Sequence, residues 1–170
     1  MFFGLFGKGF NKFLLKFLRN TNGNIGLLLR YVVLKNLCKS LGDNVSIQPG
    51  VFIFNPDKIS IGNNVSIHPM CYIEGAGEIE IGNDVSIAHA STLISTNHQW
   101  NDLEKPIKYN KETFGKIVIN DDVWIGCGVR VLSDVTIGSR SIIAAGAVVN
   151  RNVENNSIYG GVPAKKIKEI

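Results

Sequence analysis

Most of this chain is organised by an aliphatic residue at every sixth position. From residue 41 onward the period holds within five groups of three, and every member is Leu, Ile or Val. The fifteen positions are Leu41, Ile47, Ile53, Ile61, Ile67, Ile73, Ile81, Ile87, Leu93, Ile119, Ile125, Val131, Ile137, Ile143 and Val149. An amphipathic helix repeats every 3.6 residues and a half-buried strand every two, so neither produces a strict six. The pattern predicts short extended segments joined by corners, with one segment for each six residues.

The distances between the groups indicate how many segments complete one turn. The groups begin at Leu41, Ile61, Ile81, Ile119 and Ile137, and the closest two starting points are 18 residues apart. With 18 residues to a turn, every additional residue falls in the third segment of its turn. Three segments a turn predict a three-sided prism. The additional residues, including a long loop over residues 94–116, should project from one of its corners.

A small side chain stands four residues after most of the aliphatic positions. Twelve of the fifteen following positions carry Val, Cys, Ser or Ala. The three exceptions, Asp57, Gly77 and Asn97, all fall in third segments. The break in the pattern therefore marks the same corner that carries the additional residues.

Three further motifs accompany the repeat. They are VWIG at residues 123–126, IAAGAVVNRN at 143–152 and YGGVPAKKIK at 159–168. With the periodic positions they resemble the hexapeptide-repeat acyltransferases, in particular the sugar and polysaccharide O-acetyltransferases, over residues 41–168. The resemblance implies a mainly β fold, a left-handed parallel β-helix of about five three-sided coils over residues 41–170, with a short C-terminal helix. The inward aliphatic residues of successive coils would then stack into the core of a solenoid.

Residues 1–40 are predicted to form a helical segment ahead of the prism. Residues 25–40 are apolar enough to cover the open end of the first coil, which would otherwise expose side chains and strand edges. Residues 5–19 are amphipathic, with Phe on one helical face and basic residues on the other. The two sets are Phe6, Phe10, Phe13 and Phe17, and Lys8, Lys12, Lys16 and Arg19. This pattern is typical of a helix in an anionic membrane interface, and the alternative is packing against a neighbouring subunit or coil.

Length and charge limit the classes of function. A chain of 170 residues fits one domain. Its net charge is +4, yet residues 1–40 contain seven basic residues and no acidic one, so the remainder of the chain is net acidic. That distribution excludes the basic body of a nucleic-acid-binding protein.

The cysteines and the apolar runs favour an intracellular protein. Cys38, Cys71 and Cys127 form no C-x-x-C motif and leave one cysteine unpaired, so neither a disulfide framework nor a cysteine zinc site is expected. The apolar run at residues 25–29 is too short to span a bilayer, which takes roughly 20 apolar residues. Lysines interrupt the region where a signal peptide needs its apolar core. We therefore expect a cytoplasmic protein, with peripheral contact at the inner face of the membrane if residues 1–20 bind lipid.

His98 is the candidate for catalysis among the three histidines. His68 lies on a regular face and His89 at a corner, whereas His98 stands at the start of the long loop. Functional residues are common on loops that project from a rigid scaffold, and histidine titrates near neutral pH. The resemblance implies that His98 is the general base that accepts the proton of an acceptor hydroxyl.

Trp124 is expected to face outward beside an inward Val123, where a flat aromatic wall suits a sugar ring or a pantetheine arm. The resemblance implies a binding site for acetyl-CoA and places Glu74 in the region that binds acceptor. The residues implied for acetyl-CoA are Cys127, Ala145, Asn150, Arg151, Lys165 and Lys168, of which the lysines would face phosphate. No metal ion is expected.

These features predict an acetyl-CoA-dependent O-acetyltransferase that acetylates a sugar hydroxyl of a cell-surface polysaccharide or its precursor. The alternative acceptor is a small soluble sugar or a xenobiotic. The resemblance also implies a homotrimer with the active site between subunits. Two alternatives come from other classes. One is a zinc enzyme with three histidines, which here are 21 and 9 residues apart. The other is a non-catalytic β-helix used as a scaffold.

Overall fold

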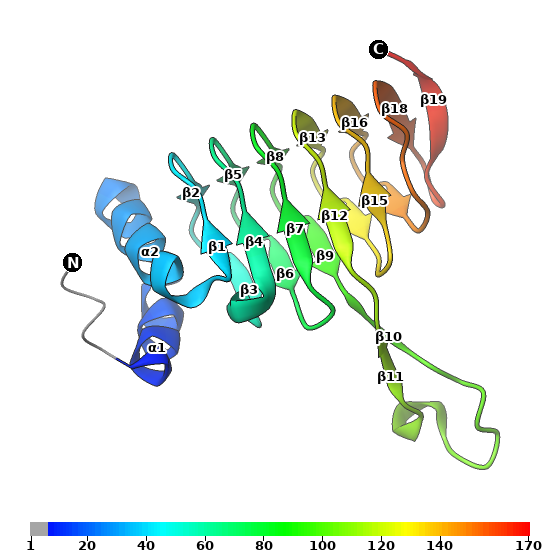
Figure 1. Ribbon diagram of the computed structural model, residues 1–170, viewed down its shortest axis with the longest axis horizontal. Helices are drawn as coiled ribbons and strands as arrows, with labels where there is room; N and C mark the ends of the chain where they lie inside the picture. Colours follow the sequence, from blue (N-terminus) through cyan, green and yellow to red (C-terminus); the bar gives the residue numbers. More distant parts are fainter. Residues whose placement is uncertain (1–6) are drawn as a thin grey trace.

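The computed structural model describes residues 7–170 and consists of a prism of three sheets with two helices at one end (Figure 1). Sheet A contains β1 (Ser40–Leu41), β4 (Ile59–Ile61), β7 (Ile79–Ile81), β12 (Ile117–Ile119) and β15 (Thr136–Ile137). Sheet B contains β2 (Ser46–Ile47), β5 (Ser66–Ile67), β8 (Ser86–Ile87), β13 (Val123–Ile125), β16 (Ser141–Ile143), β18 (Ser157–Gly160) and β19 (Lys165–Glu169). Sheet C contains β3 (Phe52–Phe54), β6 (Tyr72–Glu74), β9 (Thr92–Ile94), β14 (Arg130–Val131) and β17 (Val148–Val149). The predicted three-sided, mainly β solenoid is confirmed.

The periodic aliphatic residues form the core of the prism. They pair in register between turns, as where Ile61 lies between Leu41 and Ile81 in sheet A. Fourteen of the fifteen are buried, and Ile53 of the first turn is half-buried. The small residues four positions later are buried as well. Each turn therefore buries its apolar side chains against those of its neighbours, which is how a solenoid is stabilised.

The solenoid has about six turns, one more than the repeat predicts. Val153 forms a parallel bridge with Ile137, and β18 pairs with β16. Ile137 and Val153 are 16 residues apart, two fewer than a full turn of 18. This shortening takes the sixth turn out of the six-residue register, so the sequence pattern ends at Val149.

The chain ends in a strand, and the predicted short C-terminal helix is wrong. After β18 the chain turns at Gly161, whose φ of +95° lies in a region that favours glycine. It returns as β19, which pairs antiparallel with β18. An unpaired sheet edge leaves backbone donors and acceptors without partners, and β19 supplies partners for those of β18. Pairing at this edge therefore replaces helix formation.

The insertions leave the prism at the corner between sheets C and A, as predicted. The first forms the 3-10 helix η2 (Pro56–Lys58), and the second is a short turn after β6. The third is a hairpin of β10 (Thr96–His98) and β11 (Glu112–Phe114), with the 3-10 helix η3 (Ile107–Tyr109) in its loop. The hairpin extends well away from the body of the prism (Figure 1). The stacked sheets thus determine where the hairpin begins, while its tip lies outside the core.

Helix α2 (Gly23–Leu37) covers the open end of the first turn, and α1 (Lys8–Leu18) packs against α2. Leu34 of α2 joins the core of the prism. The predicted helical segment ahead of the prism is therefore confirmed, and α1 and β19 lie at opposite ends of the molecule (Figure 1).

The Phe face predicted for residues 5–19 lies on the outside of α1. Phe10, Phe13 and Phe17 are 46%, 65% and 76% exposed, because α1 turns Leu14 and Leu18 toward α2 instead. The alternative prediction, that these residues pack against a coil of the same chain, is therefore wrong for Phe13 and Phe17. Phe6 lies outside the described residues. Within residues 7–170, no helix has the length and hydropathy needed to cross a membrane.

Candidate active site

Close backbone packing anchors the base of the hairpin that carries His98. The Gly115 N–H group donates a hydrogen bond of 2.9 Å to the Ser95 carbonyl, which closes the hairpin where it leaves the prism. A Cβ atom on Gly77 would lie 2.4 Å from that carbonyl oxygen and 2.9 Å from the Gly115 nitrogen. A side chain at residue 77 would therefore displace the hairpin, which accounts for the glycine among the three exceptions to the small-residue pattern.

Glu74 holds the same base through both of its carboxylate oxygens. Oε1 accepts a hydrogen bond from the Ala76 N–H group (2.7 Å). Oε2 accepts hydrogen bonds from the hydroxyls of Thr96 (3.1 Å) and Ser95 (3.3 Å). These bonds connect the second turn of the prism to the first residues of the hairpin. A role for Glu74 toward the acceptor stays a prediction.

His98 ends β10 and lies directly opposite Glu112 of β11. Its Nε2 atom is 3.8 Å from Glu112 Oε1, and its side chain is 50% exposed. Both residues line a cavity of about 430 Å³, together with Ile94, Leu132 and Ser133 among others. An exposed imidazole beside a carboxylate can accept a proton, because the carboxylate stabilises the positive charge that the ring acquires.

Glu112 is a candidate functional residue that the sequence pattern does not indicate. It is 14 residues from His98 along the chain, and only the register of the hairpin brings the two together. The sole signal in the sequence is the loop length, which allows a hairpin without defining which residues pair.

Asn110 organises the remainder of the hairpin loop. Its buried Nδ2 group donates to the carbonyls of Asp102 (3.2 Å), Lys105 (3.4 Å) and Pro106 (3.3 Å). Four large apolar side chains are exposed on the outside of the hairpin loop, namely Trp100, Leu103, Ile107 and Tyr109. An ordered loop with an apolar outer surface is suited to contact with another surface.

Trp124 lies on the outer face of β13 and is 54% exposed, while Val123 and Ile125 are buried, as predicted. It borders a depression that Arg140 and Ile142 also line. Trp124 belongs to sheet B, and His98 belongs to the corner between sheets C and A. The two residues therefore do not line the same cavity of one chain.

Cys127 and Ala145 lie one above the other at the corner between sheets B and C. The Gly146 N–H group donates a hydrogen bond of 2.8 Å to the Cys127 carbonyl, which joins the two turns. Cys127 is half-buried and Ala145 is exposed. An edge built from small side chains allows the close approach of an extended ligand.

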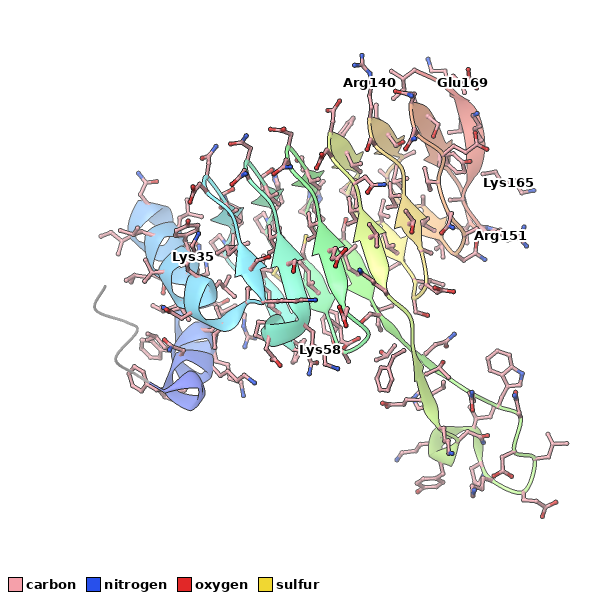
Figure 2. The ribbon with its side chains drawn as sticks, in the orientation of Figure 1. Lys35, Lys58, Arg140, Arg151, Lys165 and Glu169 are labelled. Atoms are coloured by element: carbon pink, nitrogen blue, oxygen red, sulfur yellow. The ribbon has the colours of Figure 1, made fainter. Side chains whose placement is uncertain are left out.

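Four of the residues predicted for acetyl-CoA belong to the end of the prism farthest from the helices. Asn150 and Arg151 follow β17, and Lys165 and Lys168 belong to β19, all of them exposed. Figure 2 shows the Arg151 and Lys165 side chains projecting outward from this end. Arg151 and Lys165 therefore both lie at this end of the prism, and the binding of phosphate there stays a prediction.

Lys166 differs from its two neighbouring lysines. It binds Glu154 (2.7 Å) and Glu169 (3.0 Å), and these hydrogen bonds raise the pKa of its ammonium group. Over the described part of the chain, neither Lys165 nor Lys168 has an acidic partner within ion-pair distance. Lys165 and Lys168 are thus the cations of β19 that are available to an anionic ligand.

The predicted residues do not meet at one site within a single chain. His98 and Glu74 belong to the hairpin and its base, Trp124 lies on the outer face of sheet B, and the residues predicted for acetyl-CoA follow β13, β16 and β17 or belong to β19. Residues 7–170 contain no group of three or more His, Cys, Asp or Glu side chains placed to hold a metal ion.

Comparison with known proteins identifies the repeat. Residues 116–151 match the model of the bacterial transferase hexapeptide family, described as six repeats. The chain is 32% identical over 142 residues to galactoside O-acetyltransferase of Escherichia coli, covering 83% of this chain and 68% of that enzyme. Putative acetyltransferases of Schizosaccharomyces pombe and Saccharomyces cerevisiae match over 54 residues, 32% of this chain, at 54% and 46% identity. The matched segment is 26% and 28% of the length of those two relatives.

Solved structures extend the similarity over almost the whole chain. An acetyltransferase from Vibrio cholerae in complex with acetyl coenzyme A has a TM-score of 0.84 at 28% identity, covering 95% of this chain and 86% of that one. A maltose O-acetyltransferase from Clostridium difficile has a TM-score of 0.85 at 26% identity, covering 96% and 86%. Repeat, fold and relatives agree, and the chain belongs to the hexapeptide-repeat acetyltransferase family.

Proposed function

We propose that this protein transfers an acetyl group from acetyl-CoA to a hydroxyl of a sugar-like acceptor. The observation that carries the proposal is the exposed imidazole of His98, 3.8 Å from Glu112, in a cavity at a rigidly anchored corner. The galactoside and maltose O-acetyltransferases among the relatives favour a small soluble sugar as the acceptor.

His98 has a defined task in this reaction. Its free ring nitrogen accepts the hydroxyl proton while the acceptor oxygen forms a bond to the thioester carbonyl carbon. The carbon–sulfur bond then breaks, and the protonated His98 returns its proton to the leaving thiolate. The products are an acetyl ester and CoA with a free thiol, and Glu112 stabilises the imidazolium between the two proton transfers.

The donor would extend along the corner between sheets B and C. The small residues Cys127 and Ala145 leave room for a pantetheine arm beside them. Arg151, Lys165 and Lys168 supply positive charge at the end of the prism, where the phosphates of CoA would lie. The complex of the Vibrio cholerae relative with acetyl coenzyme A supports this choice of donor.

A homotrimer would complete the active site. His98 and Trp124 line different cavities of one chain, so a neighbouring copy has to bring the two groups together. The exposed apolar residues of the hairpin, such as Trp100 and Leu103, provide a surface for such a contact. Sedimentation velocity tests this point, and a monomer with full activity would contradict it.

A second candidate acceptor is a precursor of a cell-surface glycan, held at the membrane. It is favoured by the exposed aromatic face of α1 at Phe13 and Phe17, beside a segment with seven basic residues and no acidic one. Such a helix binds anionic lipid through apolar insertion and charge together. The protein would then be a cytoplasmic enzyme at the inner face of the membrane.

Release of free thiol from acetyl-CoA tests the function directly. The assay combines the full-length protein, acetyl-CoA and a panel of neutral and anionic sugars, with mass spectrometry of the products. We expect thiol release that depends on a sugar and on His98. If no sugar in the panel produces thiol release, the result would favour the alternative of a non-catalytic β-helix scaffold.

A further inference from the structure

A second cavity lies between α1 and the first turn of the prism. It has a volume of about 240 Å³ and is lined by one side of α1 and by β3 with the residues around it. Lys12, Lys16 and Arg19 line it from the α1 side, and Phe52 and Phe54 line it from β3. Cations thus face aromatic rings across the cavity.

The three cations have different partners. The Arg19 guanidinium lies 4.0 Å from the centre of the Phe52 ring, and Lys12 Nζ lies 3.8 Å from a carboxylate oxygen of Asp57. Among residues 7–170, Lys16 has no acidic partner at ion-pair distance, and no acidic side chain lines the cavity. The cavity therefore carries an excess of positive charge.

The buried Arg30 holds this arrangement in place. Its guanidinium donates hydrogen bonds to the carbonyls of Leu18 (3.0 Å), Thr21 (2.7 Å) and Ile47 (2.8 Å). These bonds fix the end of α1 and the following turn to β2 of the prism. The cations at the end of α1 are thus positioned before any ligand binds, which lowers the entropic cost of binding.

The aromatic side of the cavity continues along sheet C toward His98. The rings of Phe54 and Tyr72 lie 5.1 Å apart. In the register of sheet C, Phe54 pairs with Glu74, and Glu74 pairs with Ile94, which lines the cavity of His98. Two strand spacings, about 10 Å, separate β3 from β9. The cations lie on the α1 side of β3, and the hairpin carries His98 beyond β9, so an acceptor that contacts both is longer than one sugar ring with its phosphate group.

We infer that the α1–β3 cavity binds a phosphate group carried by the acceptor, so that the acceptor is a phosphorylated sugar. The assignment of the acceptor rests on the proposed acetyl transfer. Arg19 and Lys16 donate hydrogen bonds to the phosphate oxygens, the first through a planar fork and the second as a point charge. Phe54 and Tyr72 present apolar surface to the sugar ring. A hydroxyl on a further sugar unit of the acceptor then faces His98.

Equilibrium binding tests the inference without requiring turnover. Titration calorimetry on the full-length protein compares glucose 1-phosphate and galactose 1-phosphate with their neutral methyl glycosides. We expect tighter binding of the phosphates. Lys16→Ala and Arg19→Gln should each weaken the phosphates about fivefold, the value of one exposed charge contact, and leave the methyl glycosides unchanged. Phe54→Ala should weaken both kinds of probe.

Lys39→Ala is the matched control. It removes a lysine that Glu78 already pairs at 3.2 Å and that lies outside the cavity, so binding of both probes should persist. Equal affinity for the phosphates and the methyl glycosides would overturn the inference. A second result would also overturn it. Variants at Lys16 and Arg19 would lose co-sedimentation with phosphatidylglycerol vesicles but keep their affinity for glucose 1-phosphate, which would assign these cations to lipid.

The outcomes separate the cavity from the proposed reaction. One outcome is phosphate-selective binding that depends on Lys16 and Arg19, with no thiol release from acetyl-CoA under any condition. It would support the phosphate site and contradict the proposed acetyl transfer. The opposite outcome is sugar-dependent thiol release that changes neither with a phosphate on the sugar nor with Lys16→Ala. It would support the proposed acetyl transfer and contradict the phosphate site.

Discussion

His98 and Glu112 are cross-strand partners in a two-stranded hairpin, with 3.8 Å between Nε2 and Oε1. The pair stands outside the hydrogen-bonded sheets of the prism, on a segment whose base is held by Glu74, Gly77 and Ser95. Changes to either side chain should therefore alter chemistry with little effect on the core.

We expect His98→Ala to remove most turnover and to leave the melting temperature unchanged. A general base contributes about 10²–10⁴-fold to the rate, and the His98 side chain is too exposed to stabilise the fold. Thiol release and a melting curve on the same sample provide the measurement. His68→Ala and His89→Ala serve as controls. An equally large loss of turnover in either control would contradict the assignment of His98 as the general base.

Glu112→Gln should lower kcat and leave KM for acetyl-CoA nearly constant. The amide preserves the size of the side chain but no longer stabilises the imidazolium of His98, whereas the donor is expected to bind elsewhere. Glu112→Asp should recover part of kcat because it restores the charge. A purely structural role would instead raise KM and lower the melting temperature in both variants.

The double variant Lys165→Ala/Lys168→Ala should weaken acetyl-CoA more than dephospho-CoA. Each exposed charge contact to phosphate is worth up to about 1 kcal/mol, or about fivefold in affinity. Lys166→Ala is the control from the same strand, because Glu154 and Glu169 already occupy its ammonium group. An equal loss of affinity for acetyl-CoA and dephospho-CoA would contradict binding of the 3′-phosphate at this surface.

Alkylation by iodoacetamide at pH 8 should modify Cys127 before Cys38 or Cys71. Burial and the charge of Asp57 raise the pKa of the Cys38 thiol to about 12, and burial raises the pKa of Cys71. A raised thiol pKa leaves little of the reactive thiolate at pH 8. Peptide mass spectrometry reads the order, and acetyl-CoA should protect Cys127. Faster labelling of Cys38 would contradict the expected order.

The aromatic face of α1 should bind anionic vesicles without contributing to stability. Phe13→Ser/Phe17→Ser should abolish co-sedimentation with anionic vesicles and keep the melting temperature, because both rings are already exposed. Leu18→Ser is the structural control, since burying such a side chain contributes roughly 1.5–3 kcal/mol and its loss should lower the melting temperature. High salt should weaken vesicle binding of the unaltered protein. A double variant that melts much lower would indicate a subunit contact.

The repeat predicts the sheets because burial is tied to position. Ile61 must face inward in every turn of this kind, and a period of six leaves it no other orientation. Glu112 could not be found in this way, since its pairing with His98 depends on hairpin register and not on burial. The sixth turn could not be predicted from the period, because the step from Ile137 to Val153 is two residues shorter than a full turn. The strand β19 forms because β18 offers it an edge, which no local pattern around Lys165 reveals.

The restriction of insertions to one corner has an evolutionary consequence. Ile94 and Ile117 stay in register with neighbouring turns although the whole hairpin lies between them. Residues 99–111 can therefore be lengthened, shortened or exchanged as a cassette without disturbing the stacked turns. Selection for a new acceptor can act on this cassette while selection for a stable scaffold acts on the prism, so the two properties can diverge independently in one small chain.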